Sequence, residues 1–517
     1  MPLPLHPTSR ASERVWPAPG VPLSRSLAMR AEELAAPHRA SRLGPTLGAL
    51  GLASWCAFAS GCSEPAYAQR SEIEARAAAA ARDERGHAEP EFVDEPIDEA
   101  VQIPSSPQPD PSASSFGADP APDLLATFPV YPPAPTVYPA DLEGNPVFGL
   151  DVAIEDPSQS SLRGFHAALR RAERGEGQAR IVVYGASHVA SDTWTGMTRR
   201  LLQQRFGDAG HGFVLPAAPW RNYRHEGVIV ESPRRGWEAR RYHRGQSVPE
   251  RFGLAGVAVE TDAAAWGRVT TSRQNASRYE LFYEAQPGGG TFDVVIDGQL
   301  VSRLPTNAPM PIGAYQTFTL PDGTHTFEVR PHGDGRVRLY GVAVEREAPG
   351  VVLDTLGING ARAASQLQWD EALFQEHLRR RAPDLVVLAY GTNESGDDEQ
   401  PIADYEAQLR QVVERVQRTV PTASCLLVGP SDRPIVARDG SAVPRPRTFE
   451  VIAVQRRVAR AYGCGFFDLV AFGGGPLHMM QWAAATPAWG ASDRIHFTRR
   501  AYDRLGQVLA NALVASY

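Results

Sequence analysis

The chain has 517 residues, of which 43% are hydrophobic and 21% are charged, so it can form two to four domains with buried cores. Its net charge of -7 excludes a generally basic surface, and we expect no nucleic-acid partner. All 52 basic residues are arginine, for which the codon bias of a GC-rich genome is a sufficient explanation.

The first 68 residues are typical of an export signal. An apolar run at 47–59 follows two arginines and is too short for a transmembrane helix. Two cleavage sites compete. Ala59-Ser60-Gly61-Cys62 resembles a bacterial lipobox, in which Cys62 is lipidated, whereas Ala66-Tyr67-Ala68 fits an ordinary signal peptidase. The first predicts an outer-membrane lipoprotein that faces the periplasm and meets the membrane only through its lipid. The second predicts a soluble periplasmic or secreted protein.

Residues 69–148 have the composition of a linker. A stretch rich in Ala, Glu and Arg is followed by one rich in Pro, Ser and acidic residues. Such a segment buries too little apolar surface to offset its chain entropy, so we expect a disordered tether. Aromatic residues interrupt this composition at 128–139, where a docked proline-rich arm is the alternative.

Residues 149–248 and 348–517 alternate between strand and helix patterns. Short apolar runs at 181–184 and 384–390 end at glycine, which is typical of buried parallel strands. Helical spacing of apolar residues follows at Tyr405, Leu409, Val412, Val413 and Val416, and again at Leu505, Val508, Leu509 and Leu513. The alternation predicts an α/β domain with a doubly wound parallel sheet, in which ligands bind beyond the carboxyl ends of the strands.

The stretch 249–347 has a different pattern. Alternating β-rich segments lie at 278–283, 291–296 and 324–329, and Asp297-Gly298 predicts a tight turn. About a hundred residues of strands and turns predict an inserted β-sandwich or jelly roll. The insert separates the two halves of the α/β domain.

Two cysteines lie near the starts of predicted strands, Cys425 and Cys464. An oxidising compartment permits a disulfide between them if those strands are neighbours, and two buried thiols are the equal alternative. Their spacing has no metal-binding signature, and we expect neither a metal nor a cofactor.

Four short blocks, far apart in the sequence, predict one hydrolytic active site. They are Gly185-Ala186-Ser187-His188, Gly357-Ile358-Asn359-Gly360, Gly391-Thr392-Asn393-Glu394 and Asp493-Arg494-Ile495-His496. An activated serine needs a base, a carboxylate that orients the base, and donors for the oxyanion. Each block alone is weak, because helix caps and loop turns use the same residues. Their order, and their places after apolar runs, favour a serine esterase.

The base and its carboxylate are predicted to be His496 and Asp493. A spacing of three residues can place both side chains on one side of a turn, where the carboxylate orients the imidazole. His188 is a rival base, but a residue directly after the serine on a strand-to-helix turn points elsewhere.

Three groups are predicted to donate hydrogen bonds to the oxyanion. Gly360 lets the backbone approach a reacting centre closely, and Asn393 offers a side-chain amide N–H. The backbone N–H of Ser187 is the third.

These blocks resemble the SGNH/GDSL hydrolase superfamily over roughly residues 150–517, which implies a flavodoxin-like α/β fold. The resemblance implies Ser187 as nucleophile, Gly360 and Asn393 as oxyanion donors, and Asp493 with His496 as the rest of the triad. Ala186 departs from the family, which usually has Asp there. That Asp is not the triad acid, so we expect activity and question only the local geometry.

The context of Ser187 also narrows the class. Val189 stands where a Gly-x-Ser-x-Gly elbow needs glycine, which argues against an α/β-hydrolase. Gly185-Ala186-Ser187-His188 followed by a β insert is similar to the bacterial peptidoglycan O-acetylesterase branch. That branch carries a carbohydrate-binding-module-like insert in the same place, which implies a cell-wall glycan or another polysaccharide as substrate.

Several side chains are candidates for substrate binding. Arginines between 221 and 244 are interleaved with aromatic residues that can stack on sugar rings and hold acidic groups. The same aromatic residues can equally fill the seam between the insert and the catalytic domain. The candidates are His188, Trp194, Trp220, Tyr223 and Trp237.

The predicted function is therefore that of an exported serine esterase that removes acyl groups, expected to be acetyl, from a polysaccharide such as peptidoglycan. A polysaccharide O-acetyltransferase would use the same triad, with a sugar hydroxyl in place of water. A glycan-binding lipoprotein with a decayed catalytic site is the alternative from another class, and Ala186 favours it.

Overall fold

The computed structural model describes residues 131–132, 135 and 137–517. The predicted export signal, Cys62 and most of the predicted linker lie outside the described residues. Within the described part of the chain, no helix is both long enough and apolar enough to cross a membrane.

A five-stranded parallel sheet forms the centre of the catalytic part. Its order is β13-β1-β14-β15-β18, and every neighbouring pair is parallel. This is the 2-1-3-4-5 order of flavodoxin-like folds, so the predicted fold class is confirmed. The strands are β1 (Gln178–Gly185), β13 (Gly350–Gly357), β14 (Leu385–Ala389), β15 (Ser424–Val428) and β18 (Gly465–Phe467).

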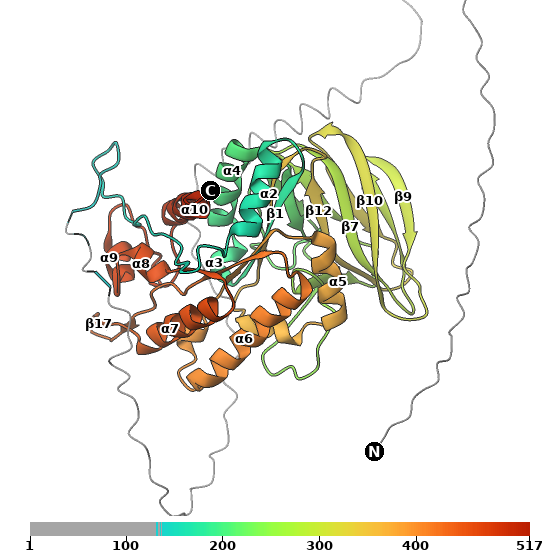
Figure 1. The fold of residues 1–517 in the computed structure, drawn as a ribbon. Helices are drawn as coiled ribbons and strands as arrows, with labels where there is room; N and C mark the ends of the chain where they lie inside the picture. The colour runs from blue at the N-terminus through green and yellow to red at the C-terminus, as the bar shows by residue number, and fades with distance from the viewer. Residues whose placement is uncertain (1–130, 133–134, 136) are drawn as a thin grey trace, which may run out of the picture. The chain divides into compact units, whose positions relative to one another are not determined.

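Helices cover both faces of this sheet (Figure 1). On one face lie α2 (Arg163–Glu173), α4 (Thr193–Phe206) and α10 (Arg499–Val514). On the other lie α5 (Glu371–Arg381), α6 (Ile402–Thr419) and α7 (Pro446–Ala461). Short helices follow the strand ends: α3 (Ser187–Ala190), η2 (Ala363–Gln368), η3 (Glu394–Gly396), α8 (Leu469–Gly473) and α9 (His478–Ala484).

Two antiparallel sheets stand beside the parallel one. The first has the order β10-β7-β12-β5-β4 with β2 also on β12, and the second has the order β3-β6-β11-β8-β9. They share one apolar core, in which Tyr279 of one sheet stacks on Phe327 of the other at 5.2 Å, so they form a sandwich. The strands are β2 (Gly210–Val214), β3 (Val228–Glu231), β4 (Glu238–Arg241), β5 (Val257–Thr261), β6 (Gly267–Thr271), β7 (Ala276–Ala285), β8 (Thr291–Ile296), β9 (Gln299–Pro305), β10 (Ile312–Gly323), β11 (Thr326–Pro331) and β12 (Val337–Glu345). A separate hairpin joins β16 (Ile435–Val436) to β17 (Ala442–Val443).

The predicted start of the insert at residue 249 is wrong. β2, β3 and β4 precede it and belong to the antiparallel sheets. These strands have only four or five residues, and β2 pairs with β12, more than a hundred residues further along the chain. Such pairings leave no local pattern in the sequence.

The six-stranded sheet packs directly on the α/β part. Phe282 of β7 lies against Phe213 and against His377 of α5, with ring centroids 5.2 Å apart in both pairs. A buried ion pair network crosses the same seam. Arg381 of α5 donates to Asp354 of β13 at 2.8 Å and to Glu345 of β12 at 2.6 Å. The two parts therefore share a core.

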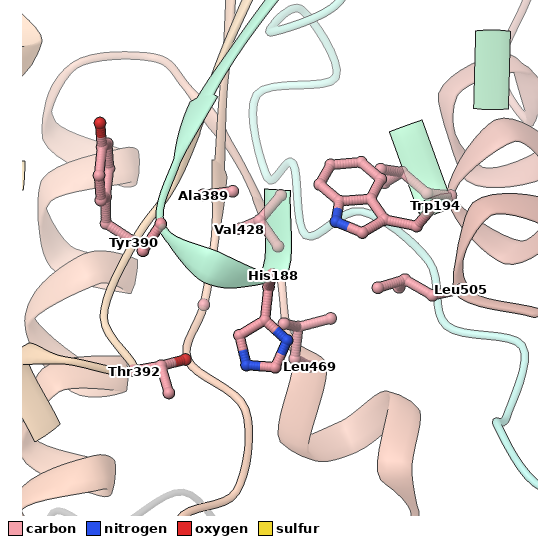
Figure 2. Close-up of a pocket in the computed structure, with 11 residues that line it drawn as sticks. His188, Trp194, Ala389, Tyr390, Thr392, Val428, Leu469 and Leu505 are labelled. Carbon is pink, nitrogen blue, oxygen red and sulfur yellow. The ribbon is translucent and has the colours of Figure 1, made fainter. Parts of the chain in front are cut away.

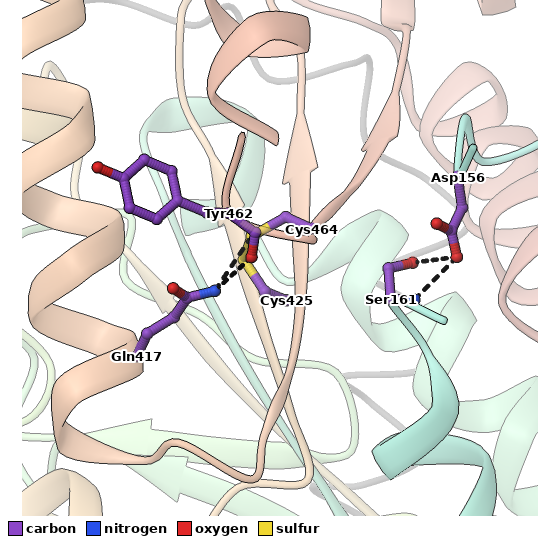
Figure 3. The surroundings of a disulfide bond; sticks show 6 residues. All are labelled: Asp156, Ser161, Gln417, Cys425, Tyr462 and Cys464. Atoms are coloured by element: carbon purple, nitrogen blue, oxygen red, sulfur yellow. Dashed lines mark hydrogen bonds between the residues drawn. A yellow bond between two sulfur atoms is a disulfide. The ribbon is translucent and has the colours of Figure 1, made fainter. Parts of the chain in front are cut away.

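A disulfide joins Cys425 and Cys464, which lie in and just before neighbouring strands β15 and β18 (Figure 3). Gln417 of α6 donates to the carbonyl of Tyr462 at 2.7 Å and so holds the backbone beside the bridge. The alternative of two buried thiols does not hold.

The described end of the predicted linker is not a free tether. Tyr131 donates its hydroxyl to Asp468 at 2.9 Å, and the ring of Tyr138 lies edge-on to Phe148 at 4.6 Å. The contacts of the two tyrosine rings hold this segment on the catalytic part despite its proline-rich composition. The described residues of 128–139 therefore fit the predicted alternative, a docked arm.

Candidate active site

Ser187 lies at the carboxyl edge of the parallel sheet, where β1 ends and α3 begins. A side chain at Gly185 would meet the carbonyl oxygen of Ala389 at 2.7 Å, so only glycine lets this turn pack against β14. The hydroxyl of Ser187 is therefore held at the point where a doubly wound sheet binds ligands.

The structure brings Ser187 together with the predicted Asp/His pair. Ser187 Oγ lies 2.7 Å from Nε2 of His496, and Nδ1 of His496 lies 2.6 Å from Oδ2 of Asp493. An ionised carboxylate only accepts, so Nδ1 carries the proton and Nε2 is left to accept the serine proton. This is the arrangement of a serine hydrolase triad.

The turn that holds the dyad explains its spacing. Oδ1 of Asp493 accepts the backbone N–H of Ile495 at 2.8 Å and that of His496 at 3.0 Å. Arg494 between them adopts a left-handed conformation with φ 59°. Burial raises the pKa of the Asp493 carboxyl, but its hydrogen bonds to His496 and Ile495 outweigh burial and hold that pKa well below its usual range. The carboxylate thus stays ionised while it orients the imidazole.

The predicted oxyanion donors lie on adjacent loops. Asn393 donates one amide N–H to the carbonyl of Ala361 at 2.9 Å, which leaves its second N–H for a substrate oxygen. Gly360 has φ 74°, and a side chain there would meet no atom of the described residues within 4 Å. The backbone conformation therefore favours glycine here, and the predicted close approach to a reacting centre stays a prediction.

Glu394 holds these two loops together, a role that the sequence did not reveal. Its carboxylate accepts the backbone N–H of Ala363 at 2.8 Å and that of Gly391 at 2.9 Å. It is only 2% exposed, and burial raises its pKa. Nothing but its place after Asn393 separates it in the sequence from a surface glutamate.

His188 is not placed to act as the base. It is buried, with Nε2 at 3.0 Å from Ser431 Oγ and Nδ1 at 2.9 Å from the hydroxyl of Tyr502. Burial lowers its pKa to about 3, so it is neutral at ordinary pH. The structure also contradicts the prediction that His188 binds substrate, because both ring nitrogens are already engaged.

His188 instead belongs to a polar chain that runs under the site. Ser431 Oγ donates to the carbonyl of Ile495 at 3.4 Å and lies 3.3 Å from Thr392 Oγ1. Since its one proton is used there, Ser431 accepts from Nε2–H of His188, and Tyr502 donates to Nδ1. The chain Tyr502–His188–Ser431–Thr392 therefore reaches the neighbours of both His496 and Asn393.

Ala186 lines a small cavity of about 20 Å³ beside His188 (Figure 2). That volume is enough for about one water molecule and too small for an acyl chain. Trp194 lines the same cavity and is only 2% exposed, so it does not stack on a sugar. The triad is assembled without the Asp that the family usually has at this position.

The other aromatic candidates mostly fill the interior. Trp237 donates to the carbonyl of Trp266 at 2.9 Å and packs on the sandwich core. Tyr223 accepts the backbone N–H of Leu215 at 2.9 Å. These two residues therefore pack inside the protein, as the alternative to sugar binding predicted. Trp220 is half-buried, with its ring edge-on to that of Tyr223 at 5.6 Å.

One group among the described residues has the composition of a metal site: Asp192, His211 and His225, all buried. Its atoms already have protein partners. Arg199 donates to both oxygens of Asp192 at 3.1 and 2.7 Å, and His225 Nδ1 lies 3.3 Å from His211 Nε2. A guanidinium on the only carboxylate disfavours a cation there, so this group fits a structural network better than a metal centre.

Residues 324–504 match the model of the GDSL-like Lipase/Acylhydrolase family. The match includes Gly360, Asn393, Asp493 and His496, and the structure adds Ser187 to them at hydrogen-bond distance. The chain therefore carries a GDSL-like acylhydrolase domain with the triad of a serine esterase. A search among curated proteins found no match for this esterase.

Two solved structures are similar to this chain to different degrees. A peptidoglycan O-acetylesterase is 25% identical, covers 70% of this esterase and 98% of its own chain, and has a TM-score of 0.59. A family two carbohydrate esterase from Clostridium thermocellum, in complex with cellohexaose, is 11% identical with a TM-score of 0.25, covering 50% of this chain and 94% of its own. The two likenesses differ in TM-score, and of these two the peptidoglycan O-acetylesterase alone shares the arrangement of the fold.

Proposed function

We propose that this esterase hydrolyses O-acetyl esters on a polysaccharide, with peptidoglycan as the first candidate. The triad of Ser187, His496 and Asp493 carries the esterase part of the proposal. The match over 98% of a peptidoglycan O-acetylesterase supports the glycan part, since it includes more than the catalytic domain. An assembled triad argues against a decayed glycan-binding protein.

The reaction follows from the geometry. Ser187 Oγ attacks the ester carbonyl while His496 Nε2 takes its proton, and Asp493 stabilises the imidazolium that forms. The negative charge on the former carbonyl oxygen is stabilised by the backbone N–H of Ser187, the backbone N–H of Gly360 and the second amide N–H of Asn393. His496 then gives this proton to the departing sugar oxygen, which leaves as a hydroxyl group as the acetyl-enzyme forms. Water, deprotonated by the same imidazole, hydrolyses the acetyl-enzyme.

Acetate release tests this function. The purified protein should release acetate from O-acetylated peptidoglycan and turn over 4-nitrophenyl acetate, and Ser187→Ala should do neither. Turnover of nitrophenyl acetate without acetate release from any acetylated glycan would refute the glycan substrate. Acetyl transfer to an added glycan, in place of free acetate, would identify the transferase alternative.

We also propose that the protein is exported. The disulfide Cys425–Cys464 supports an oxidising compartment, and the sequence before residue 69 supports a signal. Mass spectrometry of the mature N-terminus distinguishes the two routes. A lipidated Cys62 identifies a lipoprotein, and an N-terminal Gln69 identifies a free protein. An intact N-terminus in the cytoplasmic fraction would contradict both.

A further inference from the structure

A groove of about 570 Å³ leads away from the candidate oxyanion site. Its lining residues come from the end of β4 and the connection after it, at 241–244, and from η2 and α6. The groove reaches Gly360 and Ala361, and Ala361 accepts the hydrogen bond from Asn393. A polymer whose ester carbonyl lies at Ser187 can therefore continue into this groove.

The acidic side chains of the groove are already neutralised. Glu394 points its carboxylate at two backbone N–H groups. Asp397 accepts two hydrogen bonds from Arg362, at 2.5 and 2.6 Å. Neither carboxylate offers its charge to a ligand.

Two arginines that line the groove, Arg241 and Arg244, have a positive charge that is available to a ligand. Among the described residues, Arg241 forms no ion pair, and its guanidinium lies over the ring of Trp220 at 5.8 Å. Arg244 has a side chain 85% exposed, and its nearest carboxylate, that of Asp397, is 4.0 Å away and already paired. An exposed pair at that distance adds little, so both arginines line the groove with little compensation of their positive charge.

Neutral polar groups complete the wall. Gln400 donates to Gln408 at 3.0 Å, and both side chains line the groove. The buried Oε1 of Gln368, also on the wall, has no hydrogen-bond partner in the described part of the chain. Amides of this kind bind sugar hydroxyls, and arginines bind carboxylates through two parallel hydrogen bonds.

We propose that this groove binds a glycan segment that carries carboxylate groups, and that Arg241 and Arg244 determine this specificity. The proposal rests on the proposed glycan esterase function and narrows its substrate to acidic polymers. The carboxylates come either from uronic acids or from the lactyl and peptide groups of peptidoglycan.

The test compares two matched double variants of the mature protein. Arg241→Glu with Arg244→Glu reverses the charge of the groove. Arg234→Glu with Arg235→Glu makes the same change at exposed arginines of the β3–β4 segment that do not line it. Substrates are O-acetylated peptidoglycan, O-acetylated polygalacturonate, neutral acetylated glucomannan and 4-nitrophenyl acetate.

For the groove variant, kcat/KM on an acidic polymer should fall about 30-fold, mainly through KM, because two charge-assisted contacts become repulsive. Glucomannan and nitrophenyl acetate should change less than about twofold, and the control variant should match the wild type on all substrates. A loss on polygalacturonate alone or on peptidoglycan alone identifies the source of the carboxylate.

Two outcomes would overturn the proposal. One is unchanged kinetics of the groove variant on both acidic polymers, and the other is an equal loss on glucomannan. Both leave the esterase function intact, because nitrophenyl acetate and glucomannan report on the triad separately. Failure of the proposed function would appear differently, as a wild type that releases acetate from none of the polymers.

Discussion

At the scale of single residues, the side chain of Asn393 is positioned by one hydrogen bond and keeps a second for catalysis. Its bond to Ala361 fixes the amide plane, so the other N–H is held without reorganisation. Asn393→Ala should lower kcat on nitrophenyl acetate about 10²–10³-fold and leave KM nearly unchanged, because the donor acts on charge that develops in the transition state. Steady-state kinetics measure both constants. Asn275→Ala, an exposed asparagine of the sandwich, is the control. A rise in KM with constant kcat would assign Asn393 to substrate binding instead.

The two histidines beside Ser187 should behave differently. His496→Ala removes the base and should reduce kcat almost as far as Ser187→Ala does, since a serine hydroxyl is a poor nucleophile without one. His188→Ala only interrupts the chain through Ser431, so we expect a loss of about tenfold, the effect of one displaced hydrogen bond. Single-turnover release of nitrophenol from each variant measures the difference. An active His496→Ala beside an inactive His188→Ala would refute the assignment of the base.

Some site residues can be recognised from their residue type alone, whereas others can be recognised only from their contacts in the folded protein. Ser187, His496 and Asn393 have side chains whose chemistry the reaction requires, so residue type and order suffice to find them. Glu394 and Ser431 act through contacts with loops distant in the chain, and neither differs in type from ordinary polar residues. Their roles are visible only once the strands bring those loops together.

At the scale of elements, the disulfide ties β15 to β18 across a separation of 39 residues. Closing a loop of that length restricts the unfolded chain and should stabilise the fold by about 3–4 kcal/mol. Replacing both Cys425 and Cys464 by alanine should lower the unfolding free energy by that amount, as measured by urea denaturation. kcat on nitrophenyl acetate should not change in the absence of urea, because the bridge touches no triad residue. Reducing the wild type should reproduce the shift, and an unchanged midpoint would contradict the prediction.

The periodic spacing of apolar residues predicted those helices and strands whose buried positions recur regularly along the chain. The run at 181–184 is part of β1 and the helical spacing at 405–416 is part of α6, because burial repeats there with a period that sequence displays. β3 and β4 have no such periodic pattern in the sequence, and they were not predicted. Their residues are mostly half-buried or exposed, and β4 reads Glu-Ala-Arg-Arg, which no strand pattern favours. Pairing with β5 and β6, later in the chain, makes them strands.

At the scale of the whole molecule, buried histidines make stability depend on pH. Burial lowers the pKa of His188 and His377 to about 3, and that of His225 and His478 to about 4, from 6.5. Between these values the unfolded chain binds protons that the folded protein does not. Stability is therefore lost as pH falls below 6.5, at up to about 1.4 kcal/mol per pH unit for each histidine. Asp432 opposes this, because burial raises its pKa to about 6.

Urea midpoints should consequently fall steadily from pH 6.5 to pH 4.5. Burial also lowers the pKa of His211, and it raises the pKa of Asp384, Glu394, Asp468 and Asp503. The five histidines, whose ordinary pKa lies at the top of this pH range, should outweigh these carboxyls, so the net sign is acid destabilisation. His377→Gln should flatten the dependence, whereas a glutamine at His243, which is exposed, should not. A midpoint that stays constant or rises over this range would show that the histidines are protonated in the folded state.

The core that the sandwich shares with the α/β part bears on whether the sandwich can fold independently. Phe282 is fully buried and touches both Phe213 of the sandwich and His377 of α5, so it belongs to the two parts at once. The sequence predicts an insert between the two halves of the α/β domain, a position that suggests a separable module. The packing predicts instead that sandwich and catalytic domain unfold together, because excision would expose this core and leave the buried Arg381 without Glu345.

Phe282→Ala tests this coupling in a protein that can still fold. Removing a buried phenylalanine should cost about 3–5 kcal/mol. Circular dichroism and nitrophenyl acetate turnover, followed in urea, should lose their signals at one common midpoint, shifted equally from that of the wild type. Phe318→Ala, at a half-buried position of β10, should shift it much less. Activity that persists after the β signal is lost would mean that the α/β part folds alone. The groove would then be assembled from two independent domains, and the cost of Phe282→Ala would be confined to the sandwich.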